Sequence, residues 1–130
     1  MLIKRSAYRY VWWPDGSTEK HPVGSFDLFD DEKHPHRPLS LWSFGIHEEK
    51  NYGKGYGQQM LNEAIAMAGN RDIELYVICT NKVALHIYEK AGFEIVGQYN
   101  KHSYALRMLR KVKSINSTSG INIERDKYVS

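Results

Sequence analysis

Three glycines, Gly53, Gly55 and Gly57, alternate with larger residues directly before a stretch with apolar residues at helical spacing. Glycine in the first turn of a helix costs about 1 kcal/mol relative to alanine, so we expect a reason for keeping it there. The usual reason is a close approach of the backbone to a ligand, with free N–H groups directed at an anion. The sequence therefore predicts a phosphate or pyrophosphate site at the start of a helix over residues 55–68.

The patterns on both sides of the glycines predict the remaining elements. Alternating and β-branched apolar residues predict strands, while Asn81 is a good N-cap for a second helix that Gly92 ends. The predicted strands cover 6–13, 23–29, 39–46, 73–79, 94–99 and 103–109, with a tight turn at Asn100 and Lys101. Within 39–46, alternation places Trp42, Phe44 and Ile46 on one face.

This order, β-β-β-α-β-α-β-β, predicts a mixed α/β (α+β) fold with two main helices. Early hairpins are antiparallel, and strands that flank a helix are expected to be parallel. We therefore expect a largely antiparallel sheet of six to seven strands. Residues 1–110 suit a single domain, and the polar residues 111–130 are expected to form a loosely ordered tail.

Composition narrows the class of protein. Hydrophobic residues make up 42% of the 130 residues and charged residues 25%, which is typical of a globular domain. The sequence has no apolar run of the ~18 residues that a membrane span needs, and no signal-peptide pattern at the start. The single cysteine, Cys79, excludes an intramolecular disulfide. We expect a cytoplasmic protein, and the net charge of +3 suits an anionic ligand without indicating nucleic acid.

Two common phosphate-binding motifs fit the glycine stretch poorly. The P-loop string G-x-x-x-x-G-K-[ST] does not occur in the sequence. The dinucleotide motif G-x-G-x-x-G needs glycine where Gln58 stands, although Glu74 lies at a suitable distance for the acidic residue of that motif. The charged link 47–51 also separates the preceding strand from the glycines, where the dinucleotide motif has a tight turn.

A second motif gives the glycines a more specific interpretation. The segment from Asn81 to Phe93 reads Asn-x-x-Ala-x-x-x-Tyr-x-x-x-Gly-Phe, with Ala84, Tyr88 and Gly92 at the fixed positions. Together with Gly55 and Gly57, it resembles the GNAT superfamily of N-acyltransferases, over roughly residues 6–109. The chain departs from the family at Tyr52, where Arg or Gln is usual, and resembles a short form without the usual N-terminal strand and helices.

The resemblance implies acetyl-CoA as cofactor and transfer of an acetyl group to a primary amine by direct attack. The pyrophosphate would lie over the glycine stretch, and backbone N–H groups near the end of strand 39–46, in a local bulge, would bind the thioester oxygen. The residues expected to contact the cofactor are Ile46, His47, Tyr52, Gly53, Lys54, Gly55, Tyr56, Gly57, Gln58, Asn81, Ala84 and Tyr88.

Catalysis needs an acid for the departing thiolate and a base for the amine. Tyr88 is the predicted general acid, because a phenol with a pKa near 10 stays protonated at neutral pH. A helical tyrosine next to alanines can also serve for packing alone. The candidate bases near the strand end are His47 and Glu48, with Glu49 and Asp27 as further options; water remains an alternative for an amine that enters neutral.

The sequence does not identify the amine acceptor or the partners of the protein. The acceptor is either a small molecule or a macromolecule. The acceptor pocket is expected to have few walls, and a second copy of the chain in a homodimer is a candidate to complete it. We expect no membrane partner, and nucleic acid only as an aminoacyl-tRNA acceptor. His34 and His36 lack further ligands at a suitable spacing, so no metal is expected. The alternative function is a catalytically silent GNAT-like module that binds CoA or a protein partner.

Overall fold

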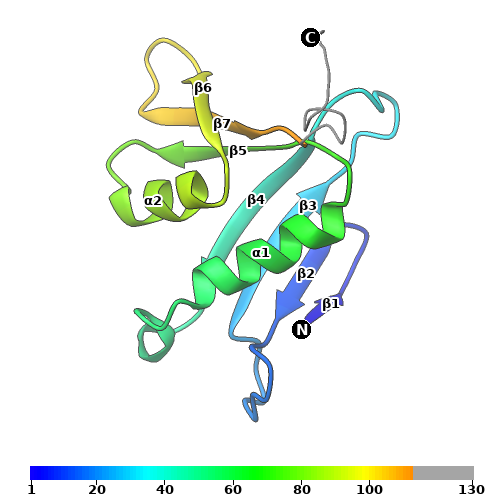
Figure 1. Cartoon of the computed structure of the whole chain (residues 1–130), viewed down its shortest axis with the longest axis vertical. Helices are drawn as coiled ribbons and strands as arrows, with labels where there is room; N and C mark the ends of the chain where they lie inside the picture. Colours follow the sequence, from blue (N-terminus) through cyan, green and yellow to red (C-terminus); the bar gives the residue numbers. More distant parts are fainter. Residues whose placement is uncertain (113–130) are drawn as a thin grey trace, which may run out of the picture.

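A computed structural model describes residues 1–112 as a seven-stranded sheet with two helices (Figure 1). The strand order is β1-β2-β3-β4-β5-β7-β6, and all pairs are antiparallel except β4 with β5. The strands are β1 (Leu2–Lys4), β2 (Arg9–Trp12), β3 (Gly24–Phe29), β4 (Leu39–Ile46), β5 (Ile73–Ile78), β6 (Glu94–Gln98) and β7 (Ala105–Arg110). The predicted mixed, largely antiparallel fold is confirmed, and the tail beyond residue 112 lies outside the described residues.

Two strand predictions were wrong in detail. The short β1 was not predicted; it pairs antiparallel with β2, Leu2 opposite Trp12, and is too brief to show alternation. The expected tight turn is instead a six-residue connection over 99–104, because β6 ends at Gln98 and β7 begins at Ala105. β5 and β6, which flank the second helix, run in the same direction as predicted, with β7 between them and antiparallel to both.

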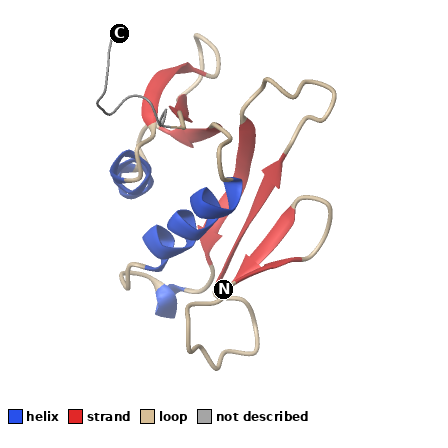
Figure 2. Ribbon diagram, turned by 45° about the vertical axis from the view of Figure 1, so that its right-hand side comes forward, coloured by secondary structure: helices blue, strands red, loops and turns tan. Residues whose placement is uncertain are grey.

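Both helices lie on the same side of the sheet, as Figure 2 shows. α1 (Tyr56–Ala68) connects β4 to β5, and α2 (Lys82–Lys90) connects β5 to β6. Successive right-handed crossovers that advance in one direction place their helices on one face. Among residues 1–112, no helix covers the other face of the sheet.

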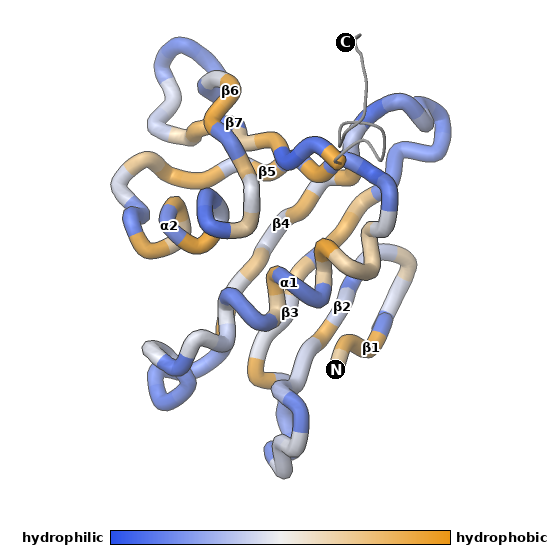
Figure 3. Tube along the Cα trace, viewed as in Figure 1, coloured by the Kyte–Doolittle hydropathy of each residue, from blue (hydrophilic) through white to orange (hydrophobic). Residues whose placement is uncertain are grey.

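The core fills the space between this helical layer and the sheet. In Figure 3 the hydrophobic colour follows the central strands, and the loops are hydrophilic. Burial of these side chains supplies the main stabilisation, at about 25 cal/mol per Å² of apolar surface. The largest fully buried side chains are Trp12, Val23, Phe26, Met60, Leu61, Ile73, Leu75 and Met108.

A bulge in β4 changes which side chains share a face. Ser25 pairs with Gly45 and Asp27 with Trp42, so both Ser43 and Phe44 stand opposite the single residue Phe26. An extra residue reverses the alternation beyond it. The expectation that Trp42 and Phe44 share a face is therefore wrong: Phe44 packs on Phe26 with ring centroids 6.1 Å apart, while Trp42 lies beside Asp27 on the uncovered face.

The strands β4 and β5 pair only at their beginnings. Leu39, Ser40 and Leu41 pair with Ile73, Glu74 and Leu75, and no pair follows. Beyond Leu41 and Leu75 the two strands separate, as Figure 1 shows, and we call this opening the β4–β5 splay. It leaves backbone groups of both strands without ladder partners on the facing edges.

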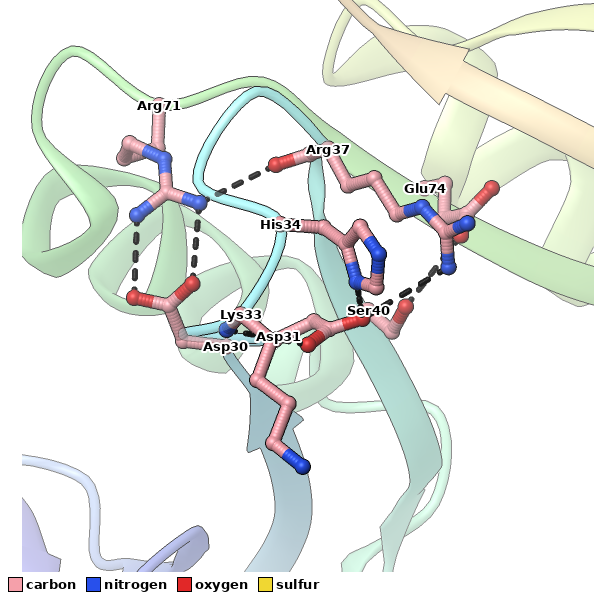
Figure 4. A network of polar contacts seen from close by, with 8 residues as sticks. All are labelled: Asp30, Asp31, Lys33, His34, Arg37, Ser40, Arg71 and Glu74. Atoms are coloured by element: carbon pink, nitrogen blue, oxygen red, sulfur yellow. Dashed lines mark hydrogen bonds and ion pairs between the residues drawn. The ribbon is translucent and has the colours of Figure 1, made fainter.

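Polar contacts hold the opposite, closed end of these two strands together (Figure 4). Arg71 donates two hydrogen bonds of 3.0 Å to the carboxylate of Asp30 and a third to the Arg37 carbonyl. This hydrogen bonding lowers the pKa of Asp30 and raises that of Arg71. The contacts join the β3–β4 loop to the segment before β5, so the two strands start in register.

Candidate active site

The glycine stretch forms the turn that starts α1. Gly53 and Gly55 have φ values of +74° and +78°, which cost an L-residue about 1–2 kcal/mol. Gly55 is the N-cap, and the first turn contains no acidic residue, so the N–H groups at this end keep their positive field. Glycine at position 57 is explained by packing. A Cβ there would lie 3.3 Å from Cδ1 of Ile87, so glycine permits close contact between α1 and α2.

α2 begins and ends where the second motif predicts. The Asn81 side chain accepts a hydrogen bond of 3.1 Å from the Ala84 N–H, which satisfies one of the free donors of the first turn. Gly92 follows with a φ of +99°. The capping role expected for Asn81 is therefore confirmed, and the helix fixes the position of Tyr88 in its last turn.

Tyr88 is buried between α2 and the sheet. It is 7% exposed, and its ring packs against Phe44 and Phe93 with centroids 5.9 and 5.8 Å apart. Burial raises the pKa of Tyr88 to about 12, because removal from water disfavours the phenolate. Since Phe44 belongs to the bulge, this contact brings Tyr88 to β4 at the β4–β5 splay.

The β3–β4 ladder determines which N–H group near the end of β4 is directed toward the splay. The His47 N–H donates to the Val23 carbonyl at 2.7 Å, so it is not available to a ligand. Hydrogen bonding alternates along an antiparallel ladder, which directs the N–H of Ile46 away from β3 and toward the splay. Of the two predicted donors, Ile46 therefore has the suitable orientation. The bulge lies at Ser43 and Phe44, earlier in β4 than expected.

The His47 side chain belongs to a polar network on the uncovered face. Its Nδ1 lies 3.1 Å from the Pro22 carbonyl, and its Nε2 lies 2.8 Å from Oγ of Ser25. A carbonyl only accepts, so Nδ1 donates to Pro22, and in the neutral imidazole Nε2 accepts from the Ser25 hydroxyl. Arg9 donates to the same Oγ at 3.1 Å and to Asp27 at 3.1 Å. Both ring nitrogens of His47 are thus engaged within the protein.

The other predicted site residues lie around the glycine turn. Glu48 is exposed and has a φ of +63°, in the link between β4 and the 3₁₀ turn η1 (Glu49–Asn51). Tyr52 is 59% exposed. Lys54 lies over the Tyr56 ring, 5.9 Å from its centroid, and the Gln58 side chain donates to Asn62 at 3.4 Å. Lys54 and Gln58 are thus held by weak contacts that a phosphate can replace.

A polar pocket of about 490 Å³ adjoins this turn and was not predicted. It lies between the β2–β3 loop and the start of α1, where an ion pair of 2.9 Å joins Glu19 to Lys50. The residues that line it are Pro14, Asp15, Gly16, Ser17, Thr18, Glu19, Val23, Asn51, Lys54, Tyr56 and Gln59. Its walls combine segments far apart in sequence, so spacing alone gave no signal for it.

Sequence reasoning also missed Ser43 and Phe44 as parts of the site. Ser43 has a φ of +53°, an uncommon conformation for a residue other than glycine. Such residues concentrate at functional sites, where surrounding structure enforces the strain. Gly45 next to them, inside a predicted strand, was the available signal for a bulge.

Metal and membrane sites are not evident in the described part of the chain. No three histidine, cysteine or acidic side chains of residues 1–112 gather closely enough to hold a metal ion. Within the same residues, neither helix has the length and apolarity that crossing a bilayer requires.

Comparisons with known proteins agree with this geometry. The model of the acetyltransferase (GNAT) family matches residues 2–93. The uncharacterized N-acetyltransferase YdgE of Bacillus subtilis (strain 168) is 28% identical over 92 residues, which cover 68% of this chain and 58% of that protein. The chain thus spans less than two thirds of the length of this relative.

Solved structures share the fold. PH1933 from Pyrococcus horikoshii OT3 has a TM-score of 0.64 at 23% identity, over 82% of this chain and 66% of the other. A chimera of the spermidine N-acetyltransferase SpeG from Vibrio cholerae and hSSAT has a TM-score of 0.62 at 25% identity, over 78% and 67% of the chains. With its two motifs and the splayed sheet, this chain belongs to the GNAT family of acetyltransferases.

Proposed function

We propose that the protein is an N-acetyltransferase that transfers the acetyl group of acetyl-CoA to a primary amine by direct attack. The contact between Tyr88 and Phe44 carries the proposal. It brings a buried, protonated hydroxyl to the edge of β4 where the Ile46 N–H faces the splay. A proton donor and an oxyanion donor at one opening are what acyl transfer from a thioester requires.

The residues around the splay fit CoA. The N-terminus of α1, with positive φ at Gly53 and Gly55 and no acidic residue in its first turn, suits a pyrophosphate. Lys54 and Gln58 are close enough in sequence to add side-chain donors. The free edges of β4 and β5 beyond Leu41 and Leu75 suit the amide groups of a pantetheine arm. Asn81 and Ala84, at the start of α2, would border the same arm.

Acetyl-CoA, when bound, supplies the thioester carbonyl and the thiolate leaving group. The Ile46 N–H is directed toward the negative charge that develops on the carbonyl oxygen. Tyr88 would give its proton to the departing sulfur as the amine nitrogen forms the new N–C bond and the C–S bond breaks. Because its pKa is about 12, Tyr88 remains protonated at neutral pH and recovers its proton from solvent.

A base makes the amine reactive. Deprotonating an alkylammonium with a pKa near 10.4 at pH 7 costs about 4–5 kcal/mol. Both ring nitrogens of His47 are hydrogen-bonded within the protein. We therefore propose that His47 positions the end of β4. Glu48, exposed directly after β4, is the base candidate that we retain, with the proton passing on to solvent.

Thermal denaturation with CoA tests the proposal. Saturation at a hundred times Kd stabilises a protein by about 2.7 kcal/mol, which raises the melting temperature by several degrees, and NAD at the same concentration is expected to have no effect. Gly55→Ala should weaken the shift by CoA. Gly69→Ala is the matched control, because Gly69 has a similar φ of +63° at the other end of α1. No shift by CoA in the wild type contradicts the proposal.

A further inference from the structure

Three aromatic side chains lie where β4 and β5 begin to separate. Trp42 and Tyr76 directly follow Leu41 and Leu75, the last paired residues of the two strands. Their ring centroids are 5.5 Å apart, and Tyr99 meets the Tyr76 ring edge-on at 5.2 Å. We call Trp42, Tyr76 and Tyr99 the aromatic platform.

The aromatic platform lies on the face that no described helix covers. Leu75 and Val77 are buried on the helical side, and the alternation of β5 directs Tyr76 to the other side. Trp42 is 46% exposed and Tyr99 is 62% exposed. Phe44 and Tyr88 lie on the helical side of the same splay, so an acceptor that approaches from the uncovered face meets the platform opposite the general acid.

Two carboxylates beside the platform are paired with arginines. Asp27, the register partner of Trp42, bonds to Arg9 at 3.1 Å, and Glu74 bonds to Arg107 at 2.8 Å. An anionic acceptor therefore finds both arginines engaged. The ring faces carry partial negative charge and attract cations. Within residues 1–112, the lysines that lie over aromatic rings are at Tyr10 and Tyr56, and none lies over the platform.

We propose that the aromatic platform binds a second, non-reacting ammonium group of the acceptor by cation–π contact, so that the preferred acceptors are primary amines with another positive charge. This inference rests on the proposed acetyl transfer. The attacking nitrogen must be neutral to form the N–C bond, so the cation that the rings attract is a different group of the same molecule. The rings select the acceptor by its charge and leave the chemical step to Tyr88.

A pair of acceptors of equal chain length provides the test, with rates compared per amine group and at equal concentrations of the form whose attacking amine is neutral. 1,4-Diaminobutane carries a second ammonium where n-pentylamine has a methyl group. We expect kcat/KM of the wild type to favour the diamine by about 3- to 30-fold, the range of a cation–π contact. Trp42→Leu should bring the ratio to about 1 through a larger loss of kcat/KM for the diamine than for n-pentylamine, and Trp42→Phe should give an intermediate ratio.

A matched control separates charge recognition from a structural effect. Phe29 is 47% exposed and lies on the same face of β3 as Asp27, and its register partner is Ser40, two residues before Trp42 in β4, so it is an exposed aromatic neighbour outside the platform. Phe29→Leu should keep the wild-type preference for the diamine. An equal loss with both amines in Trp42→Leu, or no preference in the wild type, overturns the inference while acetyl transfer itself stands. Absence of CoA binding and of any transfer contradicts the proposed function instead.

Two sources offer such an acceptor, a free diamine and a peptide with adjacent lysines. Mass spectrometry of the diamine and of the peptide after incubation with acetyl-CoA shows which of them is acetylated. Acetylation of either one that depends on Trp42 supports the inference. The competing hypothesis is that a second copy of the chain covers the aromatic platform. Sedimentation at the assay concentration tests for this dimer. A dimer in which Trp42 becomes protected from the quencher acrylamide overturns the inference.

Discussion

Tyr88 combines two properties that packing alone does not require together. Its ring fills a position between Phe44 and Phe93, which phenylalanine would fill equally well. Its hydroxyl is buried with a pKa of about 12, and burial is the cause of the shift. Burying a polar group is unfavourable, so packing accounts for the ring, and the hydroxyl fits the role of general acid that we propose.

Tyr88 should make the stability of the protein sensitive to high pH. The folded-state pKa of about 12 lies above the unfolded value of about 10, so the stabilising protonated form is fully present below pH 10. As pH rises from 10 to 12, the free energy of unfolding should fall by about 2 kcal/mol. Urea denaturation at both pH values measures this. The free energy of unfolding of Tyr88→Phe should not show this decrease. If it depends on pH in the same way in the variant and the wild type, the burial of the hydroxyl is contradicted.

Ser43 allows a test of the bulge in β4. Its φ of +53° disfavours branched side chains, although valine normally suits an exposed strand position. We expect Ser43→Val to lower the free energy of unfolding by about 1–3 kcal/mol, and Ser43→Gly to change it by less than about 1 kcal/mol. Urea denaturation of both variants provides the comparison. If Ser43→Val is as stable as Ser43→Gly, Ser43 has ordinary extended backbone dihedrals, which contradicts the positive φ.

The helices illustrate which elements a sequence of this kind specifies well. α1 was predicted over 55–68 and covers Tyr56–Ala68, because glycines mark both of its ends and the apolar spacing is regular between them. α2 follows Asn81 for the same reason. Local caps and periodicity determine these boundaries, so one sequence sufficed to locate them.

The strands illustrate what the sequence left undetermined. β1 contains three residues and depends on pairing with β2, which is a tertiary contact. The bulge depends on the register between β3 and β4, so the faces of Trp42 and Phe44 could not be assigned from alternation within β4 alone. Gly55 and Gly57 were identified from their position before a helix, and the resemblance then assigned roles to them and to Tyr88. The platform partners Tyr76 and Tyr99 come from separate elements and gave no common pattern.

The N-cap of α2 gives a prediction at the scale of the element. Removing the Asn81 side chain leaves the Ala84 N–H without its partner, so Asn81→Ala should lower the free energy of unfolding by about 1 kcal/mol. Asn62→Ala is the control, because Asn62 lies inside α1 and alanine is the better helix former there. Chemical denaturation of the two variants should give opposite signs. Equal effects contradict the capping role.

Within residues 1–112, the molecule is a sheet with helices on one face and the β4–β5 splay at its centre. The covered face supplies the core, the glycine turn and Tyr88. The uncovered face carries the aromatic platform and the His47 network. The proposed reaction needs both, with the cofactor and the acid on one side and the acceptor on the other, and the β4–β5 splay is where they meet.

The central claim, acetyl transfer at this splay with Tyr88 as the acid, is tested most directly by the release of free thiol from acetyl-CoA with and without 1,4-diaminobutane. We expect release that depends on the amine in the wild type. In Tyr88→Phe, the rate should fall by about 10²- to 10⁴-fold, the usual contribution of a general acid, while the thermal shift by CoA is retained. Release that is independent of the amine, or an unchanged rate in Tyr88→Phe, would contradict the claim.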